Sequence, residues 1–459
     1  MFTGSLNIEL SPVTATDRRD TGTDKDRRRL RRKMAVQRVA VIGAGAAGLC
    51  AARHILSRLN RFAPPVVFEL SDNVGGTWCY DERVGTRSSI YRDLRTNLPK
   101  EVMMFPDFPF DPQLDSFLPH QEVQRYLERY CRSPDLRPHI RFNTLVEKVR
   151  PVVMTTEEEE ERMTSWEVTS SDPSGCQTTE TFDSVFICSG HYSDPHIPHI
   201  PGIDRFKGQV LHSHSYRCAE PFSGQSVVVL GAKASGLDIS IELAGVGAQV
   251  TLSHGQPRLT FPLPAGVQQS SPVVAVEEDG RLRFQDGSEA AADVLMFCTG
   301  YNFRFPYLDG PELGLQIQDH LISPLYRLLM PPAFPSLFFI GLCKQICPFP
   351  NFHCQVLFSL AVLDGSVSLP SRVRREDEAR RALLEKAERG VQQRHLLVMQ
   401  QEEQWEYCQT LARVAGFPPL PPVIRSLYEE VWRQRRVHPQ NYRRRNYRLI
   451  GDDRWEQIN

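Results

Sequence analysis

The sequence lacks three features that would place it in other classes of protein. It has no C-x-x-C pair, no marked excess of either charge and no long apolar run. Its 11 cysteines are scattered and odd in number, so neither a disulfide framework nor a zinc ribbon is predicted, and we expect a reducing, cytoplasmic compartment. The longest apolar stretches, such as residues 335–343 and 356–363, fall short of the roughly 20 residues that span a bilayer, so no integral membrane segment is expected.

The charge and composition are typical of a soluble enzyme. The net charge is −1 and hydrophobic residues make up 41% of the chain, which gives no general affinity for nucleic acid. The C-terminal basic stretch, residues 433–448, is interpreted as a solvated helix and tail, because the whole chain has no basic excess. The histidines around His212 are spaced too irregularly to indicate a metal site, so no metal is predicted.

The length of the chain predicts more than one domain. A chain of 459 residues exceeds what one hydrophobic core supports, so two or three domains are expected. Residues 1–35 combine Ser, Thr and Asp with a cluster of arginines and are interpreted as a disordered leader. Nothing in the sequence indicates an oligomeric state.

A strand, a glycine-rich turn and a helix open the predicted folded part. The stretch RVAVIGAGAAGLC, residues 38–50, is an apolar strand followed by the pattern G-x-G-x-x-G. The next strand, PPVVFEL, ends at Glu69, about 20 residues past the turn, where a carboxylate meets the ribose hydroxyls of an adenine dinucleotide. The residues predicted to bind this nucleotide are Gly43, Gly45, Ala46, Ala47, Gly48 and Glu69.

A second strand and turn of the same kind occupies residues 227–238, VVVLGAKASGLD. Lys233 stands where the middle glycine is usual, but such a turn still presents backbone N–H groups and the helix N-terminus to a phosphate. The following strand ends in Ser253 and His254, with no carboxylate to repel a 2′-phosphate, so NADP is favoured and Arg258 or Lys233 is expected to pair with that phosphate. The residues predicted to bind NADP are Gly231, Ala232, Lys233, Ala234, Ser235, Gly236 and Arg258.

An internal repeat supports two nucleotide-binding units. DSVFICSG, residues 183–190, and DVLMFCTG, residues 293–300, share an acid, an apolar strand, Cys, Ser or Thr, and Gly. Each follows one of the two turns, and each is predicted to close its own sheet. The predicted fold is α/β, with two Rossmann-like dinucleotide-binding domains, the second inserted in the first, and helices at the C-terminus. The predicted boundaries are 36–205 and 296–459 for the first domain and its C-terminal helices, and 206–295 for the inserted domain.

Several motifs together carry a family resemblance. The stretch FKGQVLHSHSY, residues 206–216, fits F-x-G-x-x-x-H-x-x-x-Y and directly precedes the second turn. The others are GAGAAGL, VGGTWCY at 74–80, LRTNLPKEVMMFPDFPF at 94–110 and CTGYNFRFPYL at 298–308. Over residues 36–355 the chain resembles the flavin-containing monooxygenases. The LRTNLPKE block and the A-S-G form of the second turn are most similar to the S-oxygenating subgroup that resembles plant glucosinolate S-oxygenases.

The resemblance implies FAD at the first turn and NADPH at the second. Asn97 matches the family asparagine that lies over the flavin, and it is the expected catalytic residue. Gly75, Gly76 and Trp78 are expected along the flavin and its diphosphate. Gln355 matches a position that faces the isoalloxazine ring and is expected to bind FAD.

The resemblance also implies a reaction. NADPH passes hydride to FAD, reduced flavin combines with dioxygen as a C4a-hydroperoxide, and one oxygen atom passes to a soft sulfur or nitrogen nucleophile. The expected partners are therefore dioxygen and a small thioether or tertiary amine. His212 is expected to have a structural place at the domain junction and no catalytic role.

Three other functions occur with a fold of this kind. A disulfide oxidoreductase needs a cysteine pair beside the flavin, and Cys79 stands alone near the first turn. A Baeyer–Villiger oxygenase usually ends the 206–216 motif with Trp and Pro or Asp, whereas Tyr216 and Arg217 favour S- or N-oxygenation. A flavoprotein scaffold with little turnover is motivated by Lys233 and by the absence of an arginine at the end of the strand that precedes His254.

Overall fold

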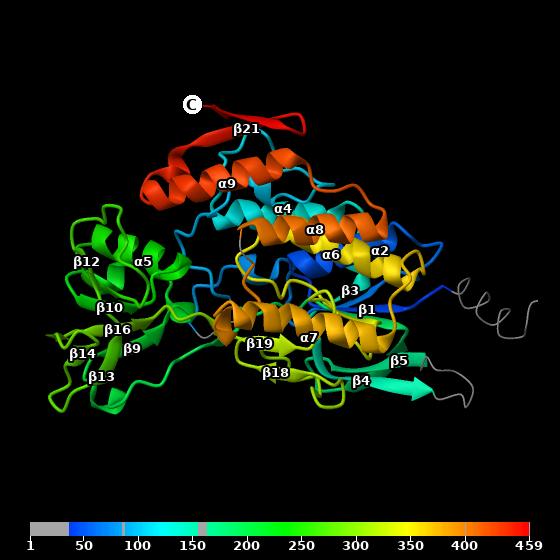
Figure 1. Ribbon diagram of the computed structural model, residues 1–459, viewed down its shortest axis with the longest axis horizontal. Coiled ribbons are helices and arrows are strands. Elements are labelled where there is room, and N and C mark those ends of the chain that lie inside the picture. The colour runs from blue at the N-terminus through cyan, green and yellow to red at the C-terminus, as the bar shows by residue number, and fades with distance from the viewer. Residues whose placement is uncertain (1–35, 85–87, 155–162, 400, 459) are drawn as a thin grey trace, which may run out of the picture. The chain divides into compact units, whose positions relative to one another are not determined.

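Two parallel five-stranded sheets organise the structure, a computed structural model that describes residues 36–84, 88–154, 163–399 and 401–458 (Figure 1). The leader predicted over residues 1–35 lies outside these residues. The first sheet has the order β20-β7-β1-β2-β3. Its strands are β1 (Val39–Ile42), β2 (Val66–Phe68), β3 (Ile140–Arg141), β7 (Ser184–Ile187) and β20 (Leu337–Phe339). Every residue of β1, β7 and β20 is buried, so both faces of the sheet must be covered.

Helices cover one face of the first sheet and a small antiparallel sheet covers the other (Figure 1). The helices are α2 (Ala46–Leu56), α4 (His120–Arg132) and α6 (Pro348–Leu363). In α4 the buried residues recur every three or four positions, as in an amphipathic helix with one face on the core. The antiparallel strands are β4 (Leu145–Met154), β5 (Met163–Ser171) and β6 (Gln177–Phe182).

The second sheet lies within the chain path of the first. Its order is β12-β11-β10-β16-β9, with α5 (Ala234–Gly245) on one face. The strands are β9 (Gln209–His212), β10 (Ser226–Leu230), β11 (Gln249–Ser253), β12 (Val267–Ser270) and β16 (Val294–Phe297). A small sheet covers the other face: β13 (Val273–Val276), β14 (Leu282–Phe284) and β15 (Glu289–Ala290). All five strands of the second sheet lie between β7 and β20, so the predicted insertion of one Rossmann-like unit in the other is confirmed.

The two chain crossings between the sheets pair with each other. The chain leaves the first sheet through β8 (Asp194–Pro195) and returns through β17 (Tyr301–Asn302), and these strands pair antiparallel. The predicted repeat is confirmed as well, because β7 pairs with β1 and β16 pairs with β10, in parallel. The Cys188 N–H donates to the Ile42 carbonyl at 2.9 Å, and the Cys298 N–H donates to the Leu230 carbonyl at 2.9 Å.

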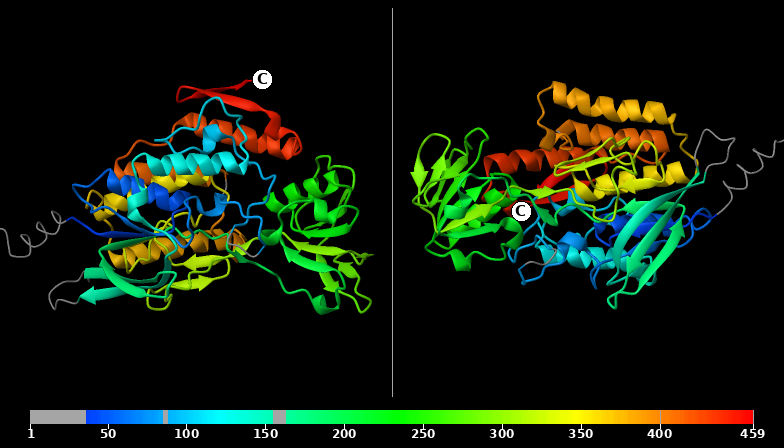
Figure 2. Two further views of the ribbon diagram at one scale, coloured as in Figure 1. Left: turned by 180° about the vertical axis from the view of Figure 1, so that it is seen from behind. Right: turned by 90° about the horizontal axis from the view of Figure 1, so that it is seen from below.

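The C-terminal part adds helices, as expected. Its elements are α7 (Arg372–Glu388), α8 (Gln401–Ala415), α9 (Pro422–Val437), β21 (Asn446–Ile450) and β22 (Arg454–Ile458). Figure 2 shows α8 beside the buried α6, against which it packs. Short elements elsewhere in the chain include α3 (Lys100–Met103), β18 (Gln316–Gln318) and β19 (Leu321–Ser323). None of the helices in the described part of the chain combines the length and the apolar character that a membrane span requires.

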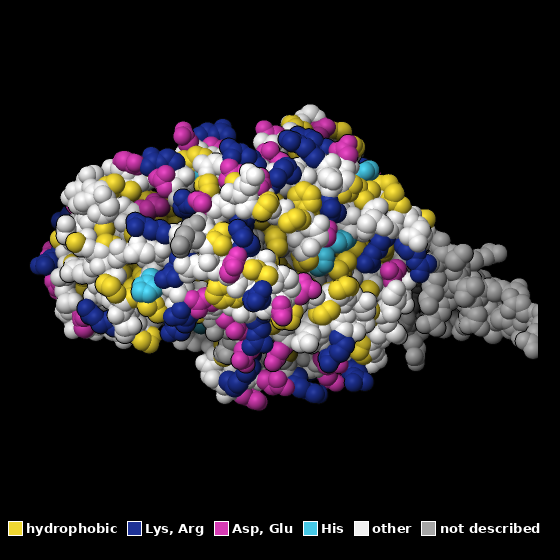
Figure 3. Space-filling view, turned by 90° about the horizontal axis from the view of Figure 1, so that it is seen from above, with side chains coloured by type: hydrophobic (Ala, Val, Ile, Leu, Met, Phe, Trp, Pro, Cys, Tyr) yellow, Lys and Arg dark blue, Asp and Glu magenta, His cyan; other side chains and the backbone are white. Residues whose placement is uncertain are grey.

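Arginines at both ends of the C-terminal basic stretch have acidic partners. Ion pairs join Arg433 to Glu430 at 2.7 Å and Arg448 to Glu456 at 3.4 Å. On the face shown in Figure 3, basic and acidic side chains are interspersed. That face therefore offers no broad positive surface of the kind that binds a phosphate backbone.

Crowding at the two β–α turns makes their outer glycines irreplaceable. A Cβ built on Gly236 would lie 1.7 Å from the Gly231 carbonyl oxygen, and a Cβ on Gly231 would lie 2.7 Å from the Cys298 carbonyl oxygen. At the other end of α5, a Cβ on Gly245 would meet nothing within 4 Å. Gly236 thus has no room for a side chain, whereas Gly245, in the same helix, does.

We expect Gly236→Ala to destabilise the protein by about 2 kcal/mol or more, because the backbone of the turn must shift to admit the methyl group. Gly245→Ala is the matched control and should leave stability unchanged or raise it by about 0.4–1 kcal/mol, through the lower entropy of the unfolded chain. Thermal and urea unfolding of both variants measure the difference. Equal effects of the two changes would contradict the packing described for the turn.

Candidate active site

The first turn leaves an open helix N-terminus at the carboxyl edge of the first sheet. Gly43 has a φ of +102°, and a Cβ on it would lie 2.7 Å from the Cys188 carbonyl oxygen. A Cβ on Gly48 would lie 1.8 Å from the Gly43 carbonyl oxygen, so neither of these two glycines has room for a side chain. Gly45 is the N-cap and makes no side-chain cap, which leaves the first N–H groups of α2 free to bind a diphosphate.

A second glycine pair lies over this turn. The Gly75 N–H donates to the Ala44 carbonyl at 3.0 Å, and a Cβ on Gly76 would lie 2.9 Å from the Cα of Gly45. Gly76 begins a short 3-10 helix, Gly76–Trp78, whose half-buried Trp78 packs on the first core. The structure thus brings together the predicted FAD residues of the first turn and those of the VGGTW segment.

Glu69 ends β2 and is buried beside the turn. Its Oε2 accepts the Ala44 N–H at 2.6 Å, and its Oε1 accepts the N–H of Ser71 at 2.8 Å and the hydroxyl of Ser71 at 2.7 Å. An ionised carboxylate has about four acceptor positions, so one position on Oε2 remains for a ribose hydroxyl. These bonds also hold the carboxylate in place before a nucleotide arrives.

The second turn repeats the first, with Lys233 in place of the middle glycine. Gly231 has a φ of +105°, like Gly43. Lys233 is the N-cap of α5 with a φ of −81°, close to the −73° of Gly45, so its backbone does not require glycine. Its side chain is exposed, as are those of Ala234 and Ser235, and the N–H groups that begin α5 stay accessible.

Basic side chains from distant segments surround Lys233. Its Nζ lies 3.2 Å from Nε2 of His395, in the short helix Gln393–His395. The pKa of His395 is lowered by burial first and then by the charges of Lys233, Arg394 and Lys344. Burial and the charge of Lys233 lower the pKa of Lys344 to about 8. Mutual repulsion of this kind marks a place where an anion would be stabilised.

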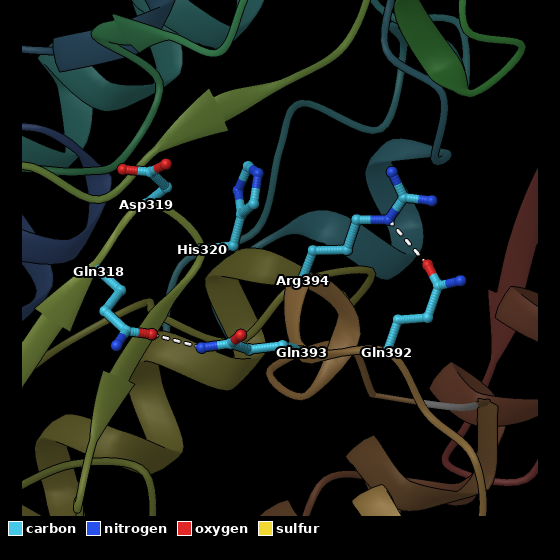
Figure 4. A pocket seen from close by; sticks show the side chains of 6 residues that line it. All are labelled: Gln318, Asp319, His320, Gln392, Gln393 and Arg394. Atoms are coloured by element: carbon cyan, nitrogen blue, oxygen red, sulfur yellow. Dashed lines mark hydrogen bonds between the residues drawn. The ribbon is translucent and has the colours of Figure 1, made fainter. Parts of the chain in front are cut away.

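A cavity lies beside this group of cations (Figure 4). Six residues line it: Gln318, Asp319, His320, Gln392, Gln393 and Arg394. Gln393 donates to Gln318, and Arg394 Nε donates to the Gln392 side chain at 3.0 Å. Figure 4 shows the His320 ring and the Arg394 side chain extending in the same direction, from the β18–β19 turn and from the Gln393–His395 helix. Sequence reasoning missed these residues, because no motif links them to the second turn.

A second cavity lies at the end of β11 and contains Arg258, the residue predicted near the 2′-phosphate. Its lining residues are Thr251, His254, Gly255, Gln256, Arg258, Gln268, Gln269, Ser270, Ser271, Pro272, Phe284, Gln285, Asp286, Ser288, Glu289 and Ala290. Arg258 is exposed and has no ion pair with any residue that the structure describes. Two carboxylates, Asp286 and Glu289, line the same cavity, so the assignment of Arg258 remains a prediction.

Asn97 lies between the two domain cores. Leu94 packs on the core of the second sheet, whereas Leu98 packs on the first. Thr96 is held by its N–H, which donates to the Leu118 carbonyl at 2.8 Å. The Asn97 side chain is half-buried and has no hydrogen bond within the described part of the chain, so its amide is available to a ligand.

Arg443, from the C-terminal segment, joins helix α5 to Thr96, the residue that precedes Asn97. Arg443 lies in the short helix Tyr442–Arg444 and binds Asp238 of α5 with two bonds, of 3.2 and 2.6 Å. Its Nε also donates to the Thr96 carbonyl at 3.0 Å. The sequence showed only a basic stretch here, since the partners of Arg443 are more than two hundred positions away.

The residues of the 206–216 motif are structural. His212 Nε2 lies 3.0 Å from the Gly300 carbonyl oxygen, and its Nδ1 accepts the N–H of His214 at 3.0 Å. Burial lowers the pKa of His212 to about 4, so the ring is neutral near pH 7. A Cβ on Gly208 would lie 2.3 Å from the Asp293 carbonyl oxygen, and the Tyr216 hydroxyl donates to Glu242 at 2.8 Å. The motif therefore braces the second sheet, as expected for His212.

Gln355, which is predicted to bind FAD, is enclosed by the protein in this structure. Its side chain is 0% exposed. The amide oxygen accepts the Gly341 N–H at 2.9 Å, and the amide nitrogen donates to the Tyr407 hydroxyl at 3.0 Å. Gln355 therefore supports the packing of α6 and α8 through both polar atoms of its amide, and its contact with FAD stays a prediction.

Two phosphate turns of this kind, each at the carboxyl edge of its own parallel sheet, define an oxidoreductase that binds two dinucleotides. Comparison with known families makes the class specific. The family model "Flavin-binding monooxygenase-like" matches residues 36–259 and 263–458. The chain therefore belongs to the flavin-binding monooxygenase-like family, and it is a monooxygenase that uses FAD and NADPH.

The chain is similar to curated plant proteins over most of its length. It is 37% identical over 407 residues to flavin-containing monooxygenase FMO GS-OX-like 2 of Arabidopsis thaliana, covering 83% of this chain and 85% of that protein. It is 36% identical over 443 residues to FMO GS-OX5 of the same plant, covering 91% of each. Among solved structures, S-allyl-L-cysteine S-oxygenase from Allium sativum matches with a TM-score of 0.81 and 32% identity, over 90% of this chain and 95% of that one.

The half-buried carboxylate of Glu242, which Tyr216 contacts, gives a pH prediction. Burial raises the pKa of Glu242 from 4.5 to about 7, although the Tyr216 hydroxyl lowers it; Asp93 and Asp238 raise it further and Arg443 lowers it. Between pH 4.5 and about 7 the folded protein still holds a proton on Glu242, whereas the unfolded chain has released it. The folded state therefore loses stability as the pH rises through this range. We expect wild type to lose stability relative to Glu242→Gln as the pH rises from 4.5 to about 7. The difference between their unfolding free energies should stay constant above that range.

Urea unfolding at pH values below, within and above this window measures the effect. The matched control is Glu388→Gln, which changes an exposed carboxylate at the end of α7. A difference between wild type and Glu242→Gln that is independent of pH would contradict the raised pKa.

Proposed function

We propose that the protein transfers one oxygen atom of dioxygen to a soft sulfur or nitrogen atom of a small molecule. A thioether becomes a sulfoxide, or a tertiary amine becomes an N-oxide. NADPH supplies two electrons, and with two protons the second oxygen atom leaves as water. The observation that carries the proposal is the half-buried amide of Asn97, which lies between the two domain cores without a partner among the described residues.

The residues of the first turn fit FAD. The glycines leave a cradle that a Cβ would fill, and Glu69 retains an acceptor position for a ribose hydroxyl. Trp78 and the glycine pair Gly75 and Gly76 would lie along the flavin and its diphosphate. When bound, FAD accepts hydride from NADPH and activates dioxygen.

The residues of the second turn fit a dinucleotide that carries an extra phosphate. The N-terminus of α5 would bind the diphosphate, and the Lys233 and Arg394 charges beside it would add to the attraction. Arg258, in the cavity at the end of β11, would reach the 2′-phosphate. We propose domain boundaries near the predicted positions 205/206 and 295/296; the second of these falls within β16 (Val294–Phe297), a strand of the second sheet.

Asn97 would act through an uncharged amide. An amide donates a hydrogen bond to developing negative charge without transferring a proton, whereas a carboxylate would repel that charge. Thr96, held by the Leu118 carbonyl and by Arg443, keeps the backbone before Asn97 in place. A dry setting matters as well, because water and stray protons discharge activated oxygen as hydrogen peroxide.

Thioethers are the first substrate class to test. The similar plant structure is named for oxygenation at the sulfur of S-allyl-L-cysteine, which is a thioether. The purified protein should be yellow, NADPH should bleach it, and a thioether should increase NADPH oxidation with formation of the sulfoxide, measured by mass spectrometry. A yellow protein that NADPH does not bleach would indicate a nucleotide-binding scaffold, and an ester formed from a cyclic ketone would indicate Baeyer–Villiger oxygenation.

Asn97→Ala should uncouple the reaction. NADPH consumption should continue while the sulfoxide formed per NADPH falls by roughly tenfold or more and hydrogen peroxide rises, because one hydrogen-bond donor to the developing charge is lost. Asn97→Asp should uncouple at least as strongly, and Asn60→Ala, in the exposed turn after α2, is the control. Unchanged coupling in Asn97→Ala would remove this residue from the proposed role.

Lys233→Met keeps the side-chain length and removes the charge. We expect the Kd for NADPH to rise by roughly fivefold, equivalent to about 1 kcal/mol, while the FAD content stays at one per chain. Lys233→Gly should weaken NADPH binding similarly, because the backbone at this position is not strained. Titration of the flavin-reduced protein with NADPH measures this Kd in both variants, and titration of the oxidised protein with NADP⁺ reports on the same site. Loss of FAD would mean that the two nucleotide sites have been exchanged.

A further inference from the structure

A cluster of metal-ligating side chains lies on α2 and α6, outside both nucleotide turns. Cys50 and His54 are four residues apart on α2 and therefore share one face of the helix. His353 faces them from α6, which packs against α2. The Cys50 sulfur and one nitrogen of each histidine all lie within 4.8 Å of one another.

The two imidazoles already have the separation that a shared metal requires. Nε2 of His54 lies 3.1 Å from Nδ1 of His353, and the ring planes meet at 72°. Two nitrogens bound tetrahedrally to zinc, each about 2.0–2.1 Å from the ion, lie about 3.3 Å apart.

Asp107 is the candidate for a fourth ligand, although it lies outside the group of three whose ligand atoms are mutually within 4.8 Å. Its Oδ1 lies 3.7 Å from Nδ1 of His353. Its Oδ2 accepts a hydrogen bond from Arg53 Nε at 2.9 Å, which orients the carboxylate. Carboxylates bonded in this way by a neighbouring group are common in metal sites, where the second contact orients the ligand.

Cys50 supplies the soft ligand. It is buried, and burial together with the charge of Asp107 raises the pKa of its thiol. A bound divalent cation reverses that balance, because a coordinating thiol loses its proton outright. One thiolate and one carboxylate then neutralise a 2+ charge, and one proton leaves for the solvent. At a tetrahedral zinc the sulfur and a nitrogen lie about 3.6 Å apart, so the three ligand atoms, now within 4.8 Å of one another, and the Asp107 carboxylate must move closer together when the ion binds.

We propose that Cys50, His54, His353 and Asp107 bind one zinc ion as a tetrahedral site. It closes with four protein ligands and is structural: it ties α2, whose N-terminus carries the first nucleotide turn, to α6 and to the loop that contains Asp107. The proposal does not depend on the oxygen-transfer reaction. The spacing of the ligands along the sequence gave no indication of it, because they come from three separate segments.

The test uses the full-length protein with FAD bound, purified and then dialysed against zinc at low concentration. We expect one zinc per chain by elemental mass spectrometry. The zinc X-ray absorption spectrum should show one sulfur at about 2.3 Å and nitrogen or oxygen at about 2.0–2.1 Å. In Cys50→Ser the sulfur shell should disappear, whereas Cys176→Ser, at an exposed cysteine, should keep it.

The affinity measurement uses the histidines. His353→Gln and His54→Gln should weaken zinc binding by at least about a hundredfold, and Arg53→Gln by roughly tenfold, as expected for a second contact to a ligand. His438→Gln, at an exposed histidine, is the control and should change nothing. FAD content and circular dichroism establish that each variant is folded. If a histidine variant does not fold, the X-ray absorption spectrum of Cys50→Ser still tests whether zinc binds at this site.

Two results would overturn the proposal. One is wild-type protein that retains no zinc above the level of the double variant Cys50→Ser/His353→Gln. The other is a sulfur shell that persists in Cys50→Ser. Either result would mean that the histidines form only a hydrogen-bonded pair and that Cys50 is a packing residue.

Discussion

The close approach of bare backbone at the two β–α turns is the constraint on which the rest of the structure depends. At each turn the first glycine faces the carbonyl oxygen of a cysteine that directly follows the neighbouring parallel strand, and the third glycine faces the carbonyl oxygen of the first. Any Cβ there would push the helix away from the strand. Because the space is empty, α2 and α5 begin directly at the sheet edge, where their free N–H groups can meet a phosphate.

The middle position of the turn obeys a different rule. Gly45 has an ordinary extended backbone, and a Cβ on it would make only an ordinary contact, 3.5 Å from the Cα of Gly76. The crowding here falls on Gly76, whose Cβ would lie 2.9 Å from the Cα of Gly45. At the second turn Lys233 has the same backbone as Gly45, with its side chain directed outward to His395. Lys233 thus departs from the sequence pattern at a position where the backbone conformation does not demand glycine.

The segment that contains Asn97 depends on both cores and on the end of the chain. Leu94 and Leu98 pack on different sheets, and Arg443 reaches from the C-terminal helix region to Thr96 and to Asp238 of α5. The Arg443 ion pair has a largely buried guanidinium and two bonds to one carboxylate, which makes it sensitive to the loss of either partner. A shift of α5 relative to the first sheet would therefore be felt at the residue next to Asn97.

The sequence by itself determined the two turns, the inserted order of the sheets, the closing strands that end in Cys188 and Cys298, and the family resemblance. These are local patterns, in which a few adjacent residues dictate a tight turn or a buried strand. Tertiary structure alone decided that Gln355 is enclosed between α6 and α8, that Arg394 and His395 stand beside Lys233, and that Arg443 joins α5 to Thr96. It also decided that Cys50, His54 and His353 converge. Such contacts join segments far apart along the chain, and their geometry follows from helix packing and burial, which leave no periodic or spaced pattern in the sequence.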